Sequence, residues 1–480
     1  MSASLWTIDP GEGGLNITAA NLRAPPPELE KFFPNGDLYR SHATLHRSLA
    51  TGIYGCKDGR YFNIHGDMNP DPTLDALDLP HDLETPTFEE GVKRFQEAVK
   101  KLDSAELQHR VSNIHRQSGA TCLSVSEFNA SKHAQANKDV GLWEIYPHPN
   151  PSQSASWWPS IPSTSTSRPL AGLKVVDLTR IIAAPAVTRG LAELGASVMR
   201  ITAPHLPDVT GLHPDLNWGK WNCSLDLRHA ADREKLTNLI LEADVVVQGY
   251  RPGVLDKFGF GQQDVIDLCA SRSRGVISVR ENCYGWHGEW QHRSGWQQIS
   301  DAVCGCNIAY GKAMGLEDGE AVQPIFPHSD YSTGTSGVCA VLIALMRRGE
   351  AGGSYAIDLA LNYYTAWMVN SVGEYPREVF EKVWAEHDRP VWRSWHSNTT
   401  TGPATMKKLR AGEGGKRLFQ PEFFEDRSAP GILCKKKFRH IRPVAHWPAG
   451  SVEPGYRIGT RGNGVDAAYW PDDLSVEVVV

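Results

Sequence analysis

Residues 173–178 read LKVVDL, a short and mostly apolar run, and similar runs occur at residues 197–201, 244–247, 275–279 and 355–359. Short, continuous apolar runs are typical of strands that are buried on both faces of a parallel sheet. Between them lie segments with helical spacing of apolar residues, at 185–194, 230–243 and 332–346. This alternation predicts a doubly wound, Rossmann-like α/β fold with right-handed crossovers.

The rest of the chain divides around this unit. Residues 147–168 are crowded with Pro and Ser, which predicts a linker. We therefore expect a smaller α+β domain at 1–146, the Rossmann-like domain at 169–372, and an extended, loop-rich tail at 373–480 that packs on the other domains. Within the tail, residues 399–416 are rich in Gly, Thr and Lys, and we predict a mobile loop there.

Composition narrows the class of protein. The 480 residues carry a net charge of −6, which gives no reason to expect a nucleic-acid partner. No run of about 18 apolar residues is present, so we expect no membrane association. The sequence starts without the basic and apolar regions of a signal peptide, and we expect a cytoplasmic protein.

Common cofactor and metal motifs are missing from the sequence. The turn after the first predicted strand, RIIAAP at 180–185, lacks the glycines of a dinucleotide site, and no GxxxxGK[ST], HExxH or GxSxG occurs. The nine cysteines are scattered, and Cys304 and Cys306 are too close for a CxxC zinc knuckle. We expect buried thiols, dispersed histidines without ligand spacing, including His292, His328 and His396, and no metal.

The segment PHSDYSTGTSG, residues 327–337, leads into the apolar helix and contains Asp330. By position alone, Asp330 is an N-cap that accepts hydrogen bonds from the first backbone N–H groups. The helix dipole also keeps such a carboxylate ionised, and an ionised carboxylate can attack a carbonyl carbon. The small residues Ser332, Gly334 and Gly337 would let a bulky thioester approach.

Residues 169–372 resemble the family III CoA-transferases, which include formyl-CoA:oxalate transferase, carnitine CoA-transferase and α-methylacyl-CoA racemase. The resemblance lies in PLAGLKVVDLTR (169–180), AELGASV (192–198), SLDL (224–227) and ADVVVQGYRPGVLDKFGF (243–260). It implies that the protein is an enzyme that transfers coenzyme A, its co-substrate, between an acyl-CoA and small carboxylic acids. It also implies that Asp330 is the nucleophile of this reaction. It also implies a homodimer.

The resemblance further assigns the residues that contact coenzyme A. These are Ile182 and Ala183, through their backbone, and Lys220, Gly249, Tyr250, Lys257 and Phe258. Lys220, Arg251 and Lys257 would supply positive charge to the phosphates. The chain departs from the family pattern at Ala203, Trp221 and the pair Gly249–Tyr250, so a catalytically impaired CoA-binding member is an alternative.

A second alternative is an α-methylacyl-CoA racemase. That branch needs a His, and the matching position in Ser294-Gly-Trp-Gln297 holds Trp296, followed by Gln297. An indole does not exchange a proton with a carbon acid, which favours transfer. Residues 54–65 and 124–144 resemble the two ends of the family's small domain, although they precede the sheet, so the chain looks permuted or like a truncated duplication.

Overall fold

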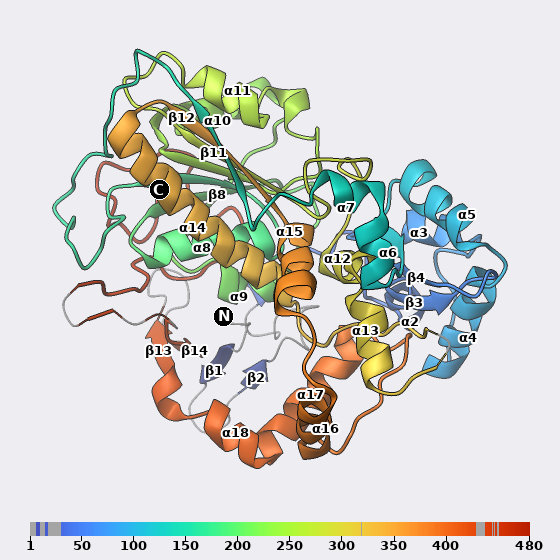
Figure 1. The fold of residues 1–480 in the computed structure, drawn as a ribbon. Coiled ribbons are helices and arrows are strands. Elements are labelled where there is room, and N and C mark those ends of the chain that lie inside the picture. Colours follow the sequence, from blue (N-terminus) through green and yellow to red (C-terminus); the bar gives the residue numbers. More distant parts are fainter. Residues whose placement is uncertain are drawn as a thin grey trace.

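The computed structural model describes residues 6–9, 15–17, 30–317, 319–428, 437–443, 445, 447–448 and 451–480. Its main sheet has seven strands in the order β6-β12-β11-β10-β7-β8-β9 (Figure 1). They are β6 (Glu144–His148), β7 (Lys174–Leu178), β8 (Ser197–Thr202), β9 (Lys220–Ser224), β10 (Val245–Gln248), β11 (Ile277–Asn282) and β12 (Ser354–Ala360).

Six of these strands run parallel, from β9 at one edge to β12, and β6 joins β12 antiparallel at the other edge. The strand order reverses between β7 and β10, as in the Rossmann fold. The predicted doubly wound α/β architecture is therefore confirmed. Strand β6 comes from the chain before the Pro/Ser-rich segment, and it overlaps the first two residues of the expected linker.

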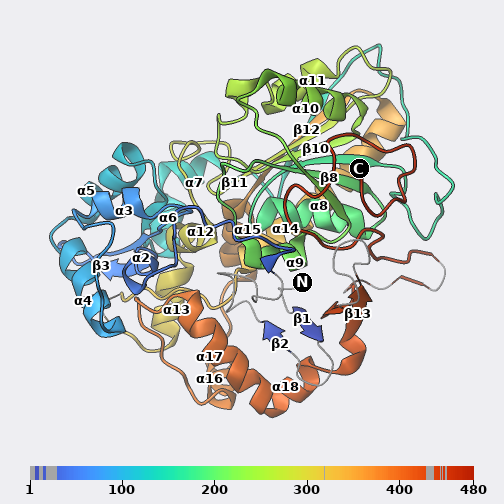
Figure 2. The ribbon, with the colours of Figure 1, turned by 180° about the vertical axis from the view of Figure 1, so that it is seen from behind.

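Helices cover both faces of the sheet because successive strand residues point in opposite directions. Val175 packs towards α8 (Ala183–Glu193) and α14 (His328–Ala351). Its neighbour Val176 packs in the opposite core, with α10 (Ala230–Glu242) and α11 (Gln262–Leu268). The opposite view in Figure 2 shows α10 and α11 together on one side of the sheet.

Helices α8 and α14 approach each other closely through glycines. A Cβ atom on Gly334 would lie 2.5 Å from the Cβ of Ala186, and one on Gly337 would lie 2.5 Å from Cγ2 of Val187. These glycines therefore serve helix packing. The expectation that Gly334 and Gly337 make room for a thioester was wrong, because the space beside them is filled by α8.

The N-terminal region has a three-stranded antiparallel sheet and its own core. The sheet is β3 (Gly52–Gly55), β4 (Tyr61–Ile64) and β5 (Gly119–Thr121). Phe62, Phe95 and Leu107 are among the core residues. The helices are α2 (Leu45–Ser48), α3 (Asp71–Ala76), α4 (Phe88–Val99), α5 (Ser104–Gln108), α6 (Val125–Ala130) and α7 (Lys132–Ala136). Helix α12 (Gln297–Cys304) contacts β4, β5 and α6, and so connects this region to the large sheet.

The C-terminal segment contains more helix than expected. After α13 (Cys306–Ala313) and α15 (Leu361–Trp367) come α16 (Arg377–Glu386), α17 (Asn398–Ala411) and α18 (Glu413–Leu418). The loop predicted at 399–416 is thus helical, because the helix-forming run MKKLRA outweighs the local glycines. Strands β13 (Phe424–Ser428) and β14 (Lys437–Ile441) pair with β1 (Trp6–Asp9) and β2 (Leu15–Ile17) in a third sheet.

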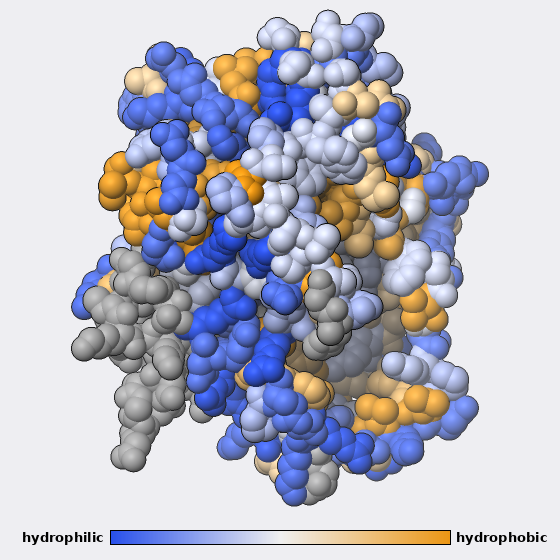
Figure 3. All heavy atoms as spheres, turned by 90° about the vertical axis from the view of Figure 1, so that its left-hand side faces the viewer, coloured by the Kyte–Doolittle hydropathy of each residue, from blue (hydrophilic) through white to orange (hydrophobic). Residues whose placement is uncertain are grey.

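Residues 451–480 run without helix or strand over the α10 face of the large sheet. Trp470, Leu474 and Val479 belong to the core on that side, and Nε1 of Trp470 donates to the carbonyl oxygen of Leu239 at 3.0 Å. The face in Figure 3 is mainly hydrophilic, with hydrophobic side chains in several separate groups. Among the described residues, no helix combines the length and apolar character needed to cross a bilayer.

Candidate active site

A cavity of 520 Å³ opens at the carboxyl ends of the central strands. Leu178 ends β7, Thr202 ends β8, Gly249 follows β10 and Asn282 ends β11, and all four line the cavity. Doubly wound sheets bind ligands at this edge, where the strand order reverses. The volume falls in the range of about 300–1,000 Å³ that small-molecule sites occupy.

Seven of the ten site residues expected from the sequence line this cavity. They are Ile182, Ala183, Gly249, Tyr250, Phe258, Trp296 and Asp330. The cavity therefore joins Asp330 to the segments expected to hold coenzyme A. Lys220, Lys257 and Gln297 are not in its wall.

Lys220 lies beneath the cavity with no exposed surface. Its Nζ atom is 2.9 Å from Oδ2 of Asp177 and 2.9 Å from the carbonyl oxygen of Pro185. Burial lowers the pKa of Lys220 to about 8, against the opposing charge of Asp177. This lysine links β9 to β7 and to the first turn of α8, and its buried amine is not part of the cavity wall where a phosphate could reach it.

The other two residues also lie elsewhere. Lys257 is exposed on a short 3₁₀ helix (Asp256–Phe258), next to the cavity residue Phe258. Gln297 is buried, and its side-chain amide donates to Asp301. Gln297 thus supports a neighbouring carboxylate instead of facing the cavity.

Four arginines give the cavity wall its positive charge, and sequence reasoning had identified one of them. They are Arg180, Arg228, Arg251 and Arg293. The guanidinium of Arg180 lies 5.2 Å from the ring centroid of Tyr250, and Arg228 is paired with Asp226. Arg180 and Arg251 lie inside the stretches that resemble the family, 169–180 and 243–260. That position could have identified Arg180 as a candidate binding residue, as it did Arg251.

Asp330 is the third residue of α14 and lies inside its first turn. The N-cap expectation was wrong, because the helix begins at His328 and Pro327 occupies the cap position. Burial, and then the charge of Asp301, raise the pKa of Asp330 to about 8. The expected ionisation by the helix dipole is therefore outweighed by desolvation and a neighbouring carboxylate.

A second carboxyl group, Glu281, shares the cavity with Asp330. It is the fifth residue of β11 and was not identified from the sequence. Burial and the charge of Asp330 raise the pKa of Glu281 well above its usual range. Within the described part of the chain, neither carboxylate accepts a hydrogen bond, so both are available to a ligand.

The cavity wall also contains an anchored indole. Trp296 precedes α12 and donates its ring N–H to Asp67, and its ring stacks on His65 with centroids 5.5 Å apart. Asp67 also accepts from Nη2 of Arg251 at 2.7 Å and from the backbone N–H of Ser118 at 3.1 Å.

The buried carboxylate of Asp67 stays ionised in this setting. Burial alone would raise the pKa of Asp67, but the hydrogen bond from His65 and the charge of Arg251 lower it to about 2. The N-terminal region thus contributes a side chain to the cavity. No sequence motif pointed to Asp67, because three of its partners, Ser118, Arg251 and Trp296, are more than 50 residues away in the chain.

Comparison with known proteins gives consistent matches. A model of CoA-transferase family III matches residues 170–389. The acetyl-coenzyme A transferase nodX of Hypoxylon pulicicidum is 51% identical over 452 residues, which cover 94% of this chain and 75% of that protein. An acyl-CoA transferase of Gibberella moniliformis is 36% identical over 351 residues, covering 72% of this chain and 61% of its own length.

A solved CaiB/BaiF family protein from Brucella suis has a TM-score of 0.43 and 19% identity, covering 62% of this chain and 96% of that one. The matches to the sequence relatives extend far beyond the stretches that first suggested the resemblance. The protein is therefore a member of CoA-transferase family III and an enzyme of that family.

Proposed function

We propose that this enzyme transfers coenzyme A from an acyl-CoA to a carboxylic acid through covalent intermediates on Asp330. The observation that carries the proposal is the position of Asp330: its carboxylate faces the cavity at the switch point of the sheet and has no hydrogen-bond partner among the described residues. A carboxylate nucleophile must reach the thioester carbon, and this geometry leaves it free to do so.

The cavity wall supports binding of coenzyme A. Arg180, Arg228 and Arg251 offer guanidinium groups for phosphates, which bind arginine through paired hydrogen bonds. Tyr250 and Phe258 offer ring surface for the adenine, and Ile182 and Ala183 lie at the start of α8, where backbone N–H groups attract anions. The arginines replace Lys220, whose charge is used within the fold.

The proposed chemistry begins with attack of an Asp330 oxygen on the thioester carbon of the donor. The C–S bond breaks, the thiolate of coenzyme A departs, and Asp330 carries a mixed anhydride. The thiolate then attacks the aspartyl carbonyl carbon and the anhydride C–O bond breaks. The donor acid departs as its carboxylate, and Asp330 now carries coenzyme A as a thioester. The acceptor carboxylate repeats these two steps in the opposite order, which regenerates Asp330.

The racemase alternative is disfavoured by the state of Trp296. That branch requires an acid–base group at this position, and the indole N–H is instead committed to Asp67. Transfer needs no such group, because a thiolate and a carboxylate are exchanged without breaking a C–H bond. An indole in the cavity wall is well suited to pack against an acyl chain.

We also propose a division into a small domain at 1–146 and a large domain at 169–372, and a cytoplasmic homodimer. The separate core of the N-terminal region supports the division. Because the relative from Hypoxylon pulicicidum is named an acetyl-coenzyme A transferase, acetyl-CoA is the first donor to test.

The deciding experiment combines exchange with trapping. The wild type, Asp330→Asn and Asp330→Ala are incubated with acetyl-CoA and a panel of carboxylic acids, and new acyl-CoAs are measured by mass spectrometry. Only the wild type should exchange, and hydroxylamine during turnover should convert Asp330 to a hydroxamate. Unchanged exchange in both variants would exclude Asp330 as the nucleophile.

A further inference from the structure

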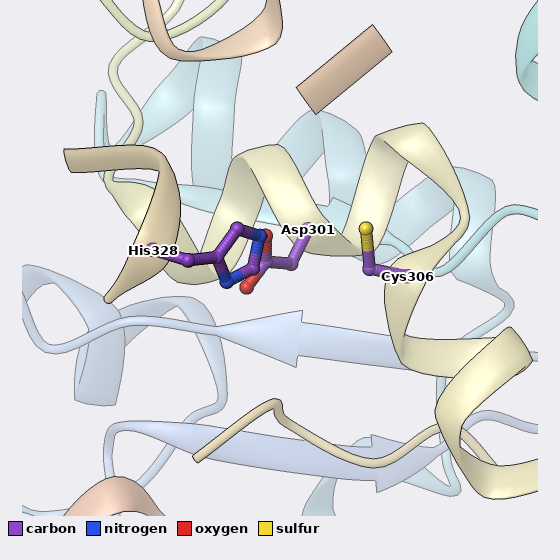
Figure 4. A group of neighbouring side chains, drawn as sticks. All are labelled: Asp301, Cys306 and His328. Carbon is purple, nitrogen blue, oxygen red and sulfur yellow. The ribbon is translucent and has the colours of Figure 1, made fainter. Parts of the chain in front are cut away.

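Three potential metal ligands meet beside the candidate active site, outside its cavity wall. Asp301 comes from α12, Cys306 is the first residue of α13, and His328 is the first residue of α14. One carboxylate oxygen, the thiol sulfur and one ring nitrogen all lie within 4.8 Å of one another. Figure 4 shows the imidazole of His328 against the carboxylate of Asp301, with the sulfur of Cys306 on its other side.

The carboxylate of Asp301 is held so that one oxygen remains available. Its Oδ2 accepts hydrogen bonds from the side-chain amides of Gln297 and Gln323, and Gln323 is itself fixed by Asn63 at 3.1 Å. Asp301 has no exposed surface, and Oδ1 has no hydrogen-bond partner in the described part of the chain. A buried carboxylate oxygen without a partner destabilises the fold, because its lost hydration is not replaced. A bound cation would remove this cost.

His328 presents a ring nitrogen to that oxygen. Its Nδ1 lies 3.2 Å from the carbonyl oxygen of Phe326, which can only accept, so Nδ1 carries the hydrogen. In the neutral ring Nε2 then carries the lone pair; it lies 3.4 Å from Oδ1 of Asp301 and is buried without a hydrogen bond. A histidine fixed in this way through its second nitrogen is typical of metal sites.

A proton on Nε2 would supply the same charge, but it would leave two features unexplained. The pair is too poorly aligned to form a hydrogen bond, and the Cys306 sulfur lies within reach of both atoms. Sulfur, imidazole nitrogen and carboxylate oxygen together suit zinc, whereas magnesium and calcium prefer oxygen ligands. Three protein ligands with an open fourth position are common at zinc sites that bind water or substrate.

We propose that Asp301, Cys306 and His328 bind one zinc ion per chain, with water or a substrate group as fourth ligand. The site goes beyond the transfer chemistry described above and depends on none of its steps. The ligands come from three helices and are separated by 5 and 22 residues. That spacing forms no local motif, which is why the sequence led us to expect no metal.

The test uses the full-length protein after dialysis against a chelator. Zinc is titrated against a chromophoric competitor, and cobalt(II) is added in parallel to look for a thiolate-to-cobalt charge-transfer band. The wild type should bind one equivalent of zinc and show the band. Cys306→Ser and His328→Gln should each weaken zinc binding by at least ~100-fold, since even changes to supporting residues cost about 10- to 100-fold.

Two controls separate the site from other causes. Cys339→Ser removes an exposed thiol from α14, outside the cluster, and should leave zinc binding unchanged. Zinc should raise the melting temperature of the wild type but not that of Cys306→Ser, whose circular dichroism without metal should match the wild type. Asp330→Asn should keep its zinc, so loss of transfer and loss of metal are measured separately.

The proposal is overturned if the wild type takes up no more zinc than a Cys306→Ser/His328→Gln double variant. It is equally overturned if Cys339→Ser removes the cobalt band while Cys306→Ser keeps it, because the bound metal would then lie elsewhere.

Discussion

Nη2 of Arg251 lies 2.7 Å from Oδ2 of Asp67, and this ion pair joins the N-terminal region to the loop after β10 at the edge of the cavity. The same carboxylate accepts from Trp296. One buried side chain from the N-terminal region therefore contacts two residues of the cavity wall, one in the loop after β10 and one just before α12.

Asp67→Asn should raise the KM for acyl-CoA about 10-fold while kcat changes less. The amide keeps the shape of the side chain but removes the charge that holds Arg251, and a charge-assisted hydrogen bond contributes about 1.5–3 kcal/mol. Steady-state kinetics measure the effect. Glu127→Gln, which removes the partner of Arg60 on the surface of the same region, is the matched control and should leave KM unchanged.

Asp330→Asn should abolish exchange and stabilise the fold at alkaline pH. The pKa of Asp330 is about 8 in the folded protein and 3.8 as the ordinary value. A group whose folded pKa is raised contributes stability below its unfolded pKa, and that contribution is lost as pH rises through the folded pKa. The variant should thus melt at nearly the wild-type temperature at pH 4 and a few degrees higher at pH 9. A constant difference at both pH values would contradict this.

The value of kcat/KM should rise as pH increases towards about 8 and then level off. Attack requires the ionised carboxylate, and kcat/KM reports ionisation in the free enzyme. Initial rates between pH 6 and 9.5, with two donors of different acyl length, test this. If the midpoint moves with the donor, the limb reports on the substrate instead of Asp330.

Gly334→Ala should destabilise the protein by about 1–3 kcal/mol, because its Cβ would lie 2.5 Å from that of Ala186 and force α8 and α14 apart. Gly414→Ala is the control: this glycine lies in α18, and a Cβ there would meet nothing within 4 Å. It should stabilise the helix by about 1 kcal/mol. Urea unfolding of both variants gives the comparison, and equal signs would refute the packing argument.

Lys220 and Arg180 should respond differently to the same substitution. Lys220→Met leaves the buried carboxylate of Asp177 without its counter-charge, and should cost about 3–5 kcal/mol of stability. Arg180→Met should instead raise the KM for acyl-CoA with little effect on stability, since Arg180 lies in the cavity wall. Thermal unfolding and kinetics are measured on both proteins. A raised KM for acyl-CoA in a folded Lys220→Met protein would show that Lys220 takes part in binding coenzyme A after all.

Apolar runs predicted the large sheet because its strands are buried on both faces, and the matched stretches predicted the segments that line the cavity. The direction of a side chain was not predictable in the same way. Lys220 and Arg180 are both cations near strand ends, and only the ion pair that Lys220 makes across β8 with Asp177 of β7 turns the lysine inward. The pKa of Asp330 likewise depends on Asp301, a residue that α12 brings into place.

Strand β6 has a consequence for how this protein could be produced. Its backbone pairs with β12 along five residues, so the chain before residue 149 is attached to the large sheet by a ladder as well as by the peptide connection. The connection from 149 to 168 contains no helix or strand, and cutting it would leave that ladder and the Asp67–Arg251 pair in place. We therefore expect the enzyme to tolerate production as two separate fragments, divided within residues 149–168, that reassemble through this ladder and this ion pair.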